Sequence, residues 1–144
     1  MSSISNASDT STDASTLTIG QLAKASGVSA KMIRYYESIE LLPPAERTES
    51  NYRIYADKDV HRLRFIHRAR KLGFSLDHIR VLMALWQDQS RSSREVKSLA
   101  IEHIGELEAR IAEMQSMVDL LQKLTHQCQG NDRPDCPILE ELAK

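Results

Sequence analysis

The longest regular pattern of apolar and polar residues lies in the C-terminal half of this 144-residue chain. Between residues 93 and 124, apolar side chains recur at alternating gaps of four and three, and Glu, Gln, Arg and Lys fill most positions between them. This spacing predicts a long helix with a narrow apolar stripe, as in a coiled coil. The stripe consists of Ala100, Ile104, Leu107, Ile111, Met114, Val118 and Leu121.

A stripe this narrow buries little within its own chain, so the helix needs a second helix to pack against. The sequence contains no other helical pattern of similar length, and we therefore expect the partner to be a second copy of the chain. The alternative is a surface helix folded onto its own domain, for which a broader apolar face is expected.

Shorter apolar patterns before this helix predict a small helical head. Thr18 and Gln21 have the spacing of a capping box, and Gly27 is suited to end the helix that they begin. Ser29 is placed to cap a second helix that runs to about Ser38. Two short helices joined by a glycine-containing turn are typical of a helix-turn-helix, although such pairs also occur in folds that never contact DNA.

A short hairpin is predicted over residues 47–55, with Asn51 in the turn and Tyr55 packed inward. Two further helices follow it. The first runs to about Lys71 with Asp57 as its cap, and the second begins at Ser75. The apolar face of the second is expected to contain Leu76, Ile79, Val81, Leu82 and Leu85. We expect Trp86 to pack between the head and the long helix rather than to bind a partner.

Charge is unevenly distributed along the chain. The net charge is −1, yet residues 17–72 contain 11 Lys and Arg against 6 Asp and Glu. A basic segment with aromatic residues favours an anionic partner, most simply nucleic acid. Residues 1–16 are rich in Ser and Thr and predict a disordered tail. The sequence contains no transmembrane segment or signal peptide, so we expect a cytoplasmic protein without a membrane partner.

Both cysteines of the chain, Cys128 and Cys136, follow the long helix and flank a loop containing Gly130 and Pro134. Two soft sulfur ligands without a further obvious donor suit two-coordinate chemistry, for which Cu(I) is the leading candidate. A structural zinc site would require four ligands. An intraloop disulfide and two thiols without special chemistry are the alternatives, the first disfavoured in the cytoplasm.

The stretch from Thr18 to Tyr55, with Ile33-Arg34-Tyr35-Tyr36-Glu37 and Asn51-Tyr52-Arg53-Ile54-Tyr55, resembles the MerR family of transcription regulators. The resemblance extends over about residues 17–142. It implies a mainly α fold, in which a winged helix-turn-helix DNA-binding head precedes a long antiparallel coiled-coil dimerisation helix and a short metal-binding loop. Glu40 and Asn51 depart from the family pattern, because glycine is usual at both positions.

The resemblance also implies where the chain meets promoter DNA. The helix from Ser29 would lie in the major groove of double-stranded DNA, with Lys31, Arg34 and Tyr36 as contacts. Arg47, Tyr52 and Arg53 of the wing would hold phosphate. A homodimer would then act on RNA polymerase at the promoter by bending and untwisting the DNA.

The cysteine loop, with Pro137 and Ile138 after it, is similar to that of the copper-responsive (CueR-like) members. In these, two thiolates bind Cu(I), Ag(I) or Au(I), one ion per loop. Sensors of divalent ions have a cysteine at the position of Ser93, donated by the partner protomer. Serine there argues for a singly charged ion, because a divalent ion needs an additional anionic ligand.

These observations define the expected organisation: a tail (1–16), a DNA-binding domain (17–86), a dimerisation coiled coil (91–125), and a metal-binding loop with a terminal helix (126–144). The expected function is Cu(I)-responsive activation of metal efflux or detoxification promoters. A redox sensor of the same fold, using Cys128 and Cys136 as a disulfide switch, is the alternative. A regulator of organic ligands lacks room for a pocket domain, and a coiled-coil adaptor would not bind DNA. The sequence contains no catalytic constellation, so we do not expect an enzyme.

Overall fold

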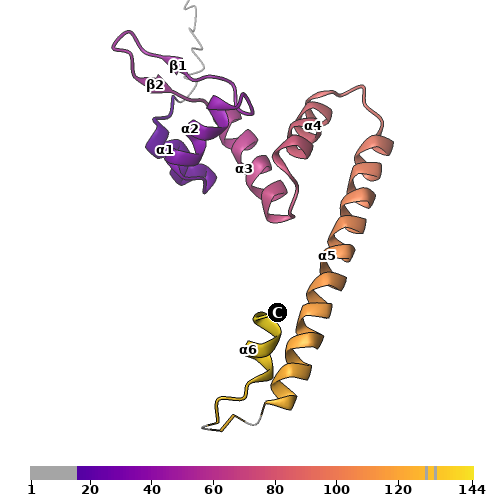
Figure 1. The fold of residues 1–144 in the computed structure, drawn as a ribbon. Coiled ribbons are helices and arrows are strands. Elements are labelled where there is room, and N and C mark those ends of the chain that lie inside the picture. The colour runs from indigo at the N-terminus through magenta and orange to yellow at the C-terminus, as the bar shows by residue number, and fades with distance from the viewer. Residues whose placement is uncertain (1–15, 129, 132) are drawn as a thin grey trace, which may run out of the picture. The chain divides into compact units, whose positions relative to one another are not determined.

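The computed structural model describes residues 16–128, 130–131 and 133–144, so nearly all of the predicted tail lies outside the described residues. The chain divides into two compact units with the boundary between Ser90 and Arg91 (Figure 1). The first unit contains α1 (Ile19–Ser26), α2 (Ala30–Ser38), β1 (Glu46–Arg47), β2 (Arg53–Ile54), α3 (Asp57–Lys71) and α4 (Leu76–Gln87), and the second contains α5 (Ser93–Gln127) and α6 (Pro137–Leu142).

Local side-chain chemistry sets the ends of α1 and α2. Thr18 Oγ1 accepts a hydrogen bond from Gln21 N at 3.2 Å, and Gln21 Oε1 accepts one from Thr18 N at 2.9 Å, which completes the predicted capping box. Gly27 adopts a left-handed conformation (φ 75°) and ends α1. Ser29 Oγ then accepts from Met32 N at 3.2 Å and caps α2. The helix-turn-helix therefore forms as predicted.

The core of the first unit lies between its helices. Helix α1 packs against α2 and α3, and α3 packs against α4. A backbone bridge between Leu17 and Tyr55, with both N–H···O distances at 2.8 Å, joins the start of the head to the hairpin. The largest fully buried side chains are Leu22, Ile33, Leu42, Leu63, Ile66 and Ile79.

Two details of the predicted helices are wrong. The cap of α3 is Ala56 rather than Asp57, because the Asp59 carboxylate reaches back to accept from Ala56 N at 2.9 Å. In α4, Val81 is exposed and Met83 is buried. Met83 lies four residues after the buried Ile79 and therefore shares its face, whereas Val81 is rotated away from it.

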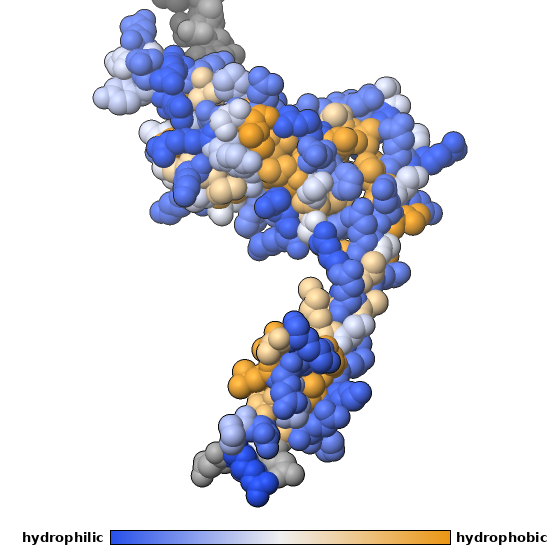
Figure 2. Space-filling view, in the orientation of Figure 1, coloured by the Kyte–Doolittle hydropathy of each residue, from blue (hydrophilic) through white to orange (hydrophobic). Residues whose placement is uncertain are grey.

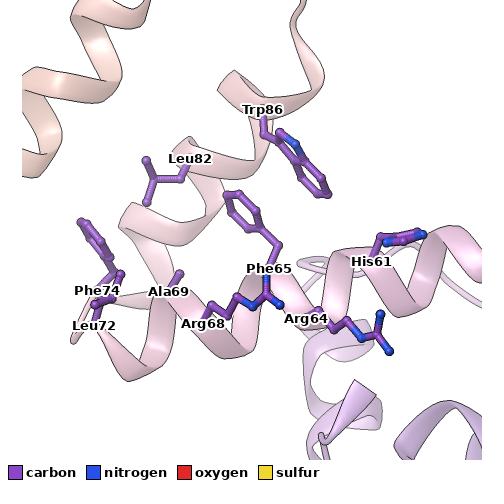
Figure 3. A pocket seen from close by; sticks show the side chains of 9 residues that line it. All are labelled: His61, Arg64, Phe65, Arg68, Ala69, Leu72, Phe74, Leu82 and Trp86. Carbon is purple, nitrogen blue, oxygen red and sulfur yellow. The ribbon is translucent and has the colours of Figure 1, made fainter. Parts of the chain in front are cut away.

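Trp86, near the end of α4, packs on α3. Its ring stacks on Phe65 with centroids 4.6 Å apart and planes 7° apart. The two rings help to line a pocket of about 430 Å³ between α3 and α4, together with Leu82, Arg64 and Arg68 (Figure 3). The stacked pair therefore joins the two helices within the head.

The second unit consists of α5 and the short α6, which packs against it. Hydrophobic side chains gather where α6 lies beside α5 (Figure 2), and Leu124 is buried there. Most of the predicted apolar stripe nevertheless remains exposed within this unit. Exposed fractions are 51% for Ile104, 65% for Ile111, 61% for Met114, 45% for Val118 and 52% for Leu121.

The predicted fold class is confirmed: a helix-turn-helix head carries a wing-like hairpin and is followed by one long helix. Within the described residues, no helix combines the length and apolar character needed to cross a membrane.

Candidate nucleic-acid interface and cysteine loop

Helix α2 has one buried and one exposed face. Ile33 and Tyr36, three residues apart, point into the core, whereas Lys31, Arg34 and Tyr35 are exposed. The exposed face begins at the capped N-terminus of the helix, where backbone N–H groups and the helix dipole favour an anion. Lys31 and Arg34 add positive charge to the same face.

Tyr36 does not fit the predicted set of DNA contacts, because only 5% of it is exposed and it belongs to the core. The burial of Tyr36 could have been predicted from the sequence, because its spacing from Ile33 puts both residues on the apolar side of the helix. The preceding Tyr35 is 45% exposed and lies on the outer face. Tyr35 therefore replaces Tyr36 as the aromatic side chain of the exposed surface.

The wing is a two-stranded antiparallel ribbon in which Arg47 lies opposite Arg53. Asn51 has φ 68° and donates its backbone N–H to Thr48 O at 2.8 Å, which confirms the predicted turn residue. Arg47 Nη1 donates to Asn51 O at 3.1 Å, and this bond holds the guanidinium against the turn. Tyr52 is 72% exposed at the tip.

A polar cluster ties the wing to α2. Tyr55, which is buried as predicted, donates a short hydrogen bond from its hydroxyl to the Glu37 carboxylate. Arg53 Nη1 lies 3.9 Å from the other oxygen of Glu37. Burial, reinforced by the hydrogen bond to Glu37 and its charge, raises the pKa of Tyr55 from 10.0 to about 12.

This cluster brings predicted DNA-binding residues from separate elements around one pocket. Arg34 of α2 and Arg47 and Arg53 of the wing line a cavity of about 280 Å³, together with Glu37 and Ser38. Three guanidinium groups against one carboxylate leave the pocket with net positive charge. Planar guanidinium donors match the oxygens of a phosphate group. The surface can therefore hold the backbone of a nucleic acid beside the exposed face of α2.

The cysteine pair lies between the two helices of the second unit. Cys128 is the residue that ends α5, and its N–H donates to Leu124 O at 3.0 Å. Cys136 immediately precedes α6, which begins with Pro137 as predicted. Both side chains are partly buried, and both thiols are free.

The surroundings of Cys136 favour its thiolate. The backbone N–H of Leu139, then that of Ile138, and also the Cys128 side chain hydrogen-bond to its sulfur, and these contacts lower its pKa below the usual value. A thiolate at a helix N-terminus is stabilised by N–H groups that have no partner within the helix. These neighbours outweigh the opposing effect of burial on the pKa of Cys136, so its thiolate is favoured beside the Cys128 side chain.

A third protein ligand is absent from the part of the chain that the structure describes. No group of three or more His, Cys, Asp and Glu side chains comes together there. Ser93 is the exposed first residue of α5, whereas Cys128 ends this helix of 35 residues. At a rise of about 1.5 Å per residue the two lie roughly 50 Å apart in one protomer, so Ser93 reaches a cysteine pair only from another copy.

A helix-turn-helix and a wing with two arginines, followed by a long helix and a thiol pair, define the class of winged helix-turn-helix DNA-binding proteins. Two family models match the chain: "MerR HTH family regulatory protein" over residues 17–85 and "MerR, DNA binding" over residues 60–124. The chain belongs to the MerR family of transcription regulators. Members of this family are DNA-binding regulators, which confirms the prediction that the protein is not an enzyme.

Relatives and solved structures agree with this assignment. The chain is 59% identical over 127 residues to heavy metal-dependent transcription regulator 2 of Rhizobium meliloti, covering 88% of this chain and 86% of that protein. It is 39% identical to the regulator CueR of Salmonella typhimurium, covering 88% and 92%. The crystal structure of PbrR691 from Ralstonia metallidurans in complex with lead(II) superposes with a TM-score of 0.76 at 32% identity, covering 88% and 98%.

Proposed function

We propose that this chain is a homodimeric regulator that binds promoter DNA and responds to Cu(I), or to Ag(I) or Au(I). The observation that carries the metal assignment is the pair of neighbouring sulfurs, Cys128 and Cys136, without a third ligand among the described residues. Soft sulfur ligands select Cu(I), and two of them are too few for a structural zinc site, which takes four ligands. The named dependence of a 59% identical relative on heavy metals supports a metal signal.

The dimer follows from the exposed stripe of α5. Apolar side chains from Ile104 to Leu121 recur at coiled-coil spacing, and most of them remain about half exposed. We propose that a second copy covers them in an antiparallel arrangement, which brings Ser93 of one protomer toward the cysteine pair of the other. Serine supplies no thiolate, so the ligand set remains two sulfurs.

DNA is held by the exposed face of α2 and by the wing. We propose that the helix capped by Ser29 enters the major groove with Lys31 and Arg34, while Arg47, Tyr52 and Arg53 hold the sugar-phosphate backbone. The pocket shared by the three arginines supports this division. The proposed domains are residues 17–86 for DNA binding, 91–125 for dimerisation and 126–144 for metal binding.

Regulation requires that metal binding favour one arrangement of the dimer on DNA. The cysteines end α5 and precede α6, so a bound ion would fix α6 relative to α5. We propose that the resulting change bends and untwists a promoter of a metal efflux or detoxification gene so that RNA polymerase can use it.

The proposal is tested by measuring promoter-duplex bending with a dye at each DNA end, using reduced protein without oxygen. Cu(I) should change the energy transfer, Zn(II) should not, and Cys128→Ser should abolish the response while retaining DNA binding. Arg47→Ala should weaken binding and reduce the slope of log K against log salt by about one. A response to an oxidant instead of Cu(I) would support the disulfide switch and contradict the metal proposal.

A further inference from the structure

The end of helix α2 contains a strained residue. Glu40 follows the cap residue Ile39 and has φ 59°, in the left-handed region that residues other than glycine adopt at a cost. The chain then turns sharply, because Leu41 N and Leu42 N both donate to Tyr36 O, at 2.9 and 3.1 Å. The carbonyl groups of Ile39 and Glu40 therefore point away from the helix and need other donors.

Arg80 of α4 supplies these donors. Its Nη2 donates to Ile39 O at 2.6 Å and its Nη1 donates to Glu40 O at 3.1 Å. One guanidinium thus bridges two consecutive carbonyl oxygens that precede it by about 40 positions in the sequence. A positive charge at the C-terminal end of a helix is also favourable to the helix dipole.

Beside these hydrogen bonds, α4 and the turn are separated by a cavity. A cavity of about 350 Å³ lies between the side chains of α4 and the turn, lined by Leu42, Pro43, Arg80 and Met83 among others. Helix α4 itself is held in the core by the buried Ile79 and Met83. Arg80 therefore connects α4 to the end of α2 across a space that side chains do not fill.

A second arginine provides a matched comparison. Arg64 of α3 donates from Nε and Nη2 to Ala25 O, at 3.3 and 3.1 Å, near the end of α1. Helices α1 and α3 also pack directly against each other. Removing Arg64 therefore leaves the direct packing of α1 on α3. Removing Arg80 leaves the buried Leu41, Leu42 and Met83 beside the cavity, but no hydrogen-bond donor from α4 for the carbonyl groups of Ile39 and Glu40.

We propose that Arg80 is a positioning residue that couples α4 to the DNA-reading helix α2. Helix α4 is the last helix before the boundary with the second unit. Along the chain, a conformational change that begins in the second unit therefore meets α4 first. The two hydrogen bonds of Arg80 convert a displacement of α4 into a displacement of the end of α2. This inference rests on the proposed function only for the signal that moves α4.

The first test needs no metal. Amide hydrogen exchange of the free, reduced protein is compared for wild type, Arg80→Gln and Arg64→Gln. Arg80→Gln should raise exchange at residues 39–42 about tenfold, the effect expected for lost charge-assisted hydrogen bonds. Arg64→Gln should leave those amides unchanged. Unchanged exchange at residues 39–42 in Arg80→Gln would overturn the inference, whether or not the protein senses a metal.

The second test separates coupling from stability, using the bending assay at saturating promoter duplex with and without Cu(I). Arg80→Gln should retain Cu(I) binding but reduce the metal-dependent change in bending at least fivefold, a loss within the usual range of coupling between sites. Arg80→Lys should recover part of it, and Arg64→Gln should respond like wild type. A full response in a folded Arg80→Gln variant would overturn the coupling role. If Cu(I) does not change DNA bending by the wild-type protein, the proposed function is contradicted. The hydrogen-exchange comparison would still decide whether Arg80 positions the end of α2.

Discussion

The two units of this chain bury their apolar residues in different ways. The head encloses Leu22, Ile33, Leu63 and Ile66 completely among four short helices. The long α5 instead leaves large apolar side chains about half exposed, although its periodic pattern is the most regular in the sequence. A regular apolar pattern therefore predicts a helix without predicting that its own domain will cover it. The head buries its apolar residues within one chain, and we propose that a second copy covers those of α5.

Among the substitutions considered, those on α5 should have the largest effect, because they should weaken the proposed dimer. A double variant, Ile111→Glu with Val118→Glu, places charges in the proposed dimer contact, where each unpaired charge costs several kcal/mol. We expect the dimer dissociation constant to rise by at least about 10³-fold. Analytical ultracentrifugation measures whether the protein has the mass of a monomer or of a dimer. Glu108→Gln on the same helix is the control and should remain a dimer. A dimer that persists in the double variant would contradict a contact along this stripe.

Truncation in the head should act on folding rather than on association. Ile33→Ala removes a fully buried side chain and should lower the free energy of unfolding by about 2–5 kcal/mol. Ile104→Ala, measured in the monomeric double variant, should change it by less than about 0.5 kcal/mol because the side chain is already half exposed. Urea unfolding followed by circular dichroism compares the two. Equal losses would mean that α5 is covered within its own chain.

The polar cluster between the wing and α2 should make the free energy of unfolding of the head depend on pH in the alkaline range. The pKa of Tyr55 is raised to about 12, so the unfolded chain, with its value of 10.0, loses this proton first as pH rises. The stabilisation is therefore fully present below pH 10 and is lost between pH 10 and 12, by about 1 kcal/mol after allowance for solvent screening. Tyr55→Phe should lose this part of the pH dependence in urea unfolding at pH 9 to about 12. A variant with the wild-type profile would exclude Tyr55 as its source.

The smallest expected effect concerns the strained end of α2. Glu40→Gly removes the cost of a left-handed glutamate but increases the freedom of the unfolded chain, so the net stabilisation should be about 0.5 kcal/mol. Thermal unfolding measures this change, and Glu49→Gly in the wing turn, where no positive φ is present, should not stabilise the protein. Destabilisation by Glu40→Gly would indicate that the glutamate side chain contributes more than its conformation costs.

Much of this architecture could be predicted from the sequence because it depends on neighbouring residues. Thr18, Ser29 and Ser75 cap their helices with their own hydroxyl groups, and Asn51 tolerates the turn that it occupies. These interactions span two to four positions, so the order of residues reveals them directly. The family resemblance of the head rests on the same segments.

The errors at Tyr36, Val81 and the cap of α3 concern local signals that were present in the sequence, whereas other features depend on distant elements. Tyr36 looked suitable for DNA because it is aromatic and follows Arg34, but the core beneath α2 takes it. The bond from Tyr55 to Glu37 and the bridge from Arg80 join residues 18 and about 40 positions apart, and no local pattern predicts such pairs. The proximity of the two cysteines likewise depends on how α6 packs on α5.

We propose that Cys128 and Cys136 alone bind a singly charged ion. The most direct measurement is X-ray absorption at the copper edge of the reduced, Cu(I)-loaded protein, with one ion per loop. We predict two sulfur neighbours per copper, and no nitrogen or oxygen neighbour from His126 or Asp135. Three or four ligands, or a site that forms equally well in Cys136→Ser, would contradict the account.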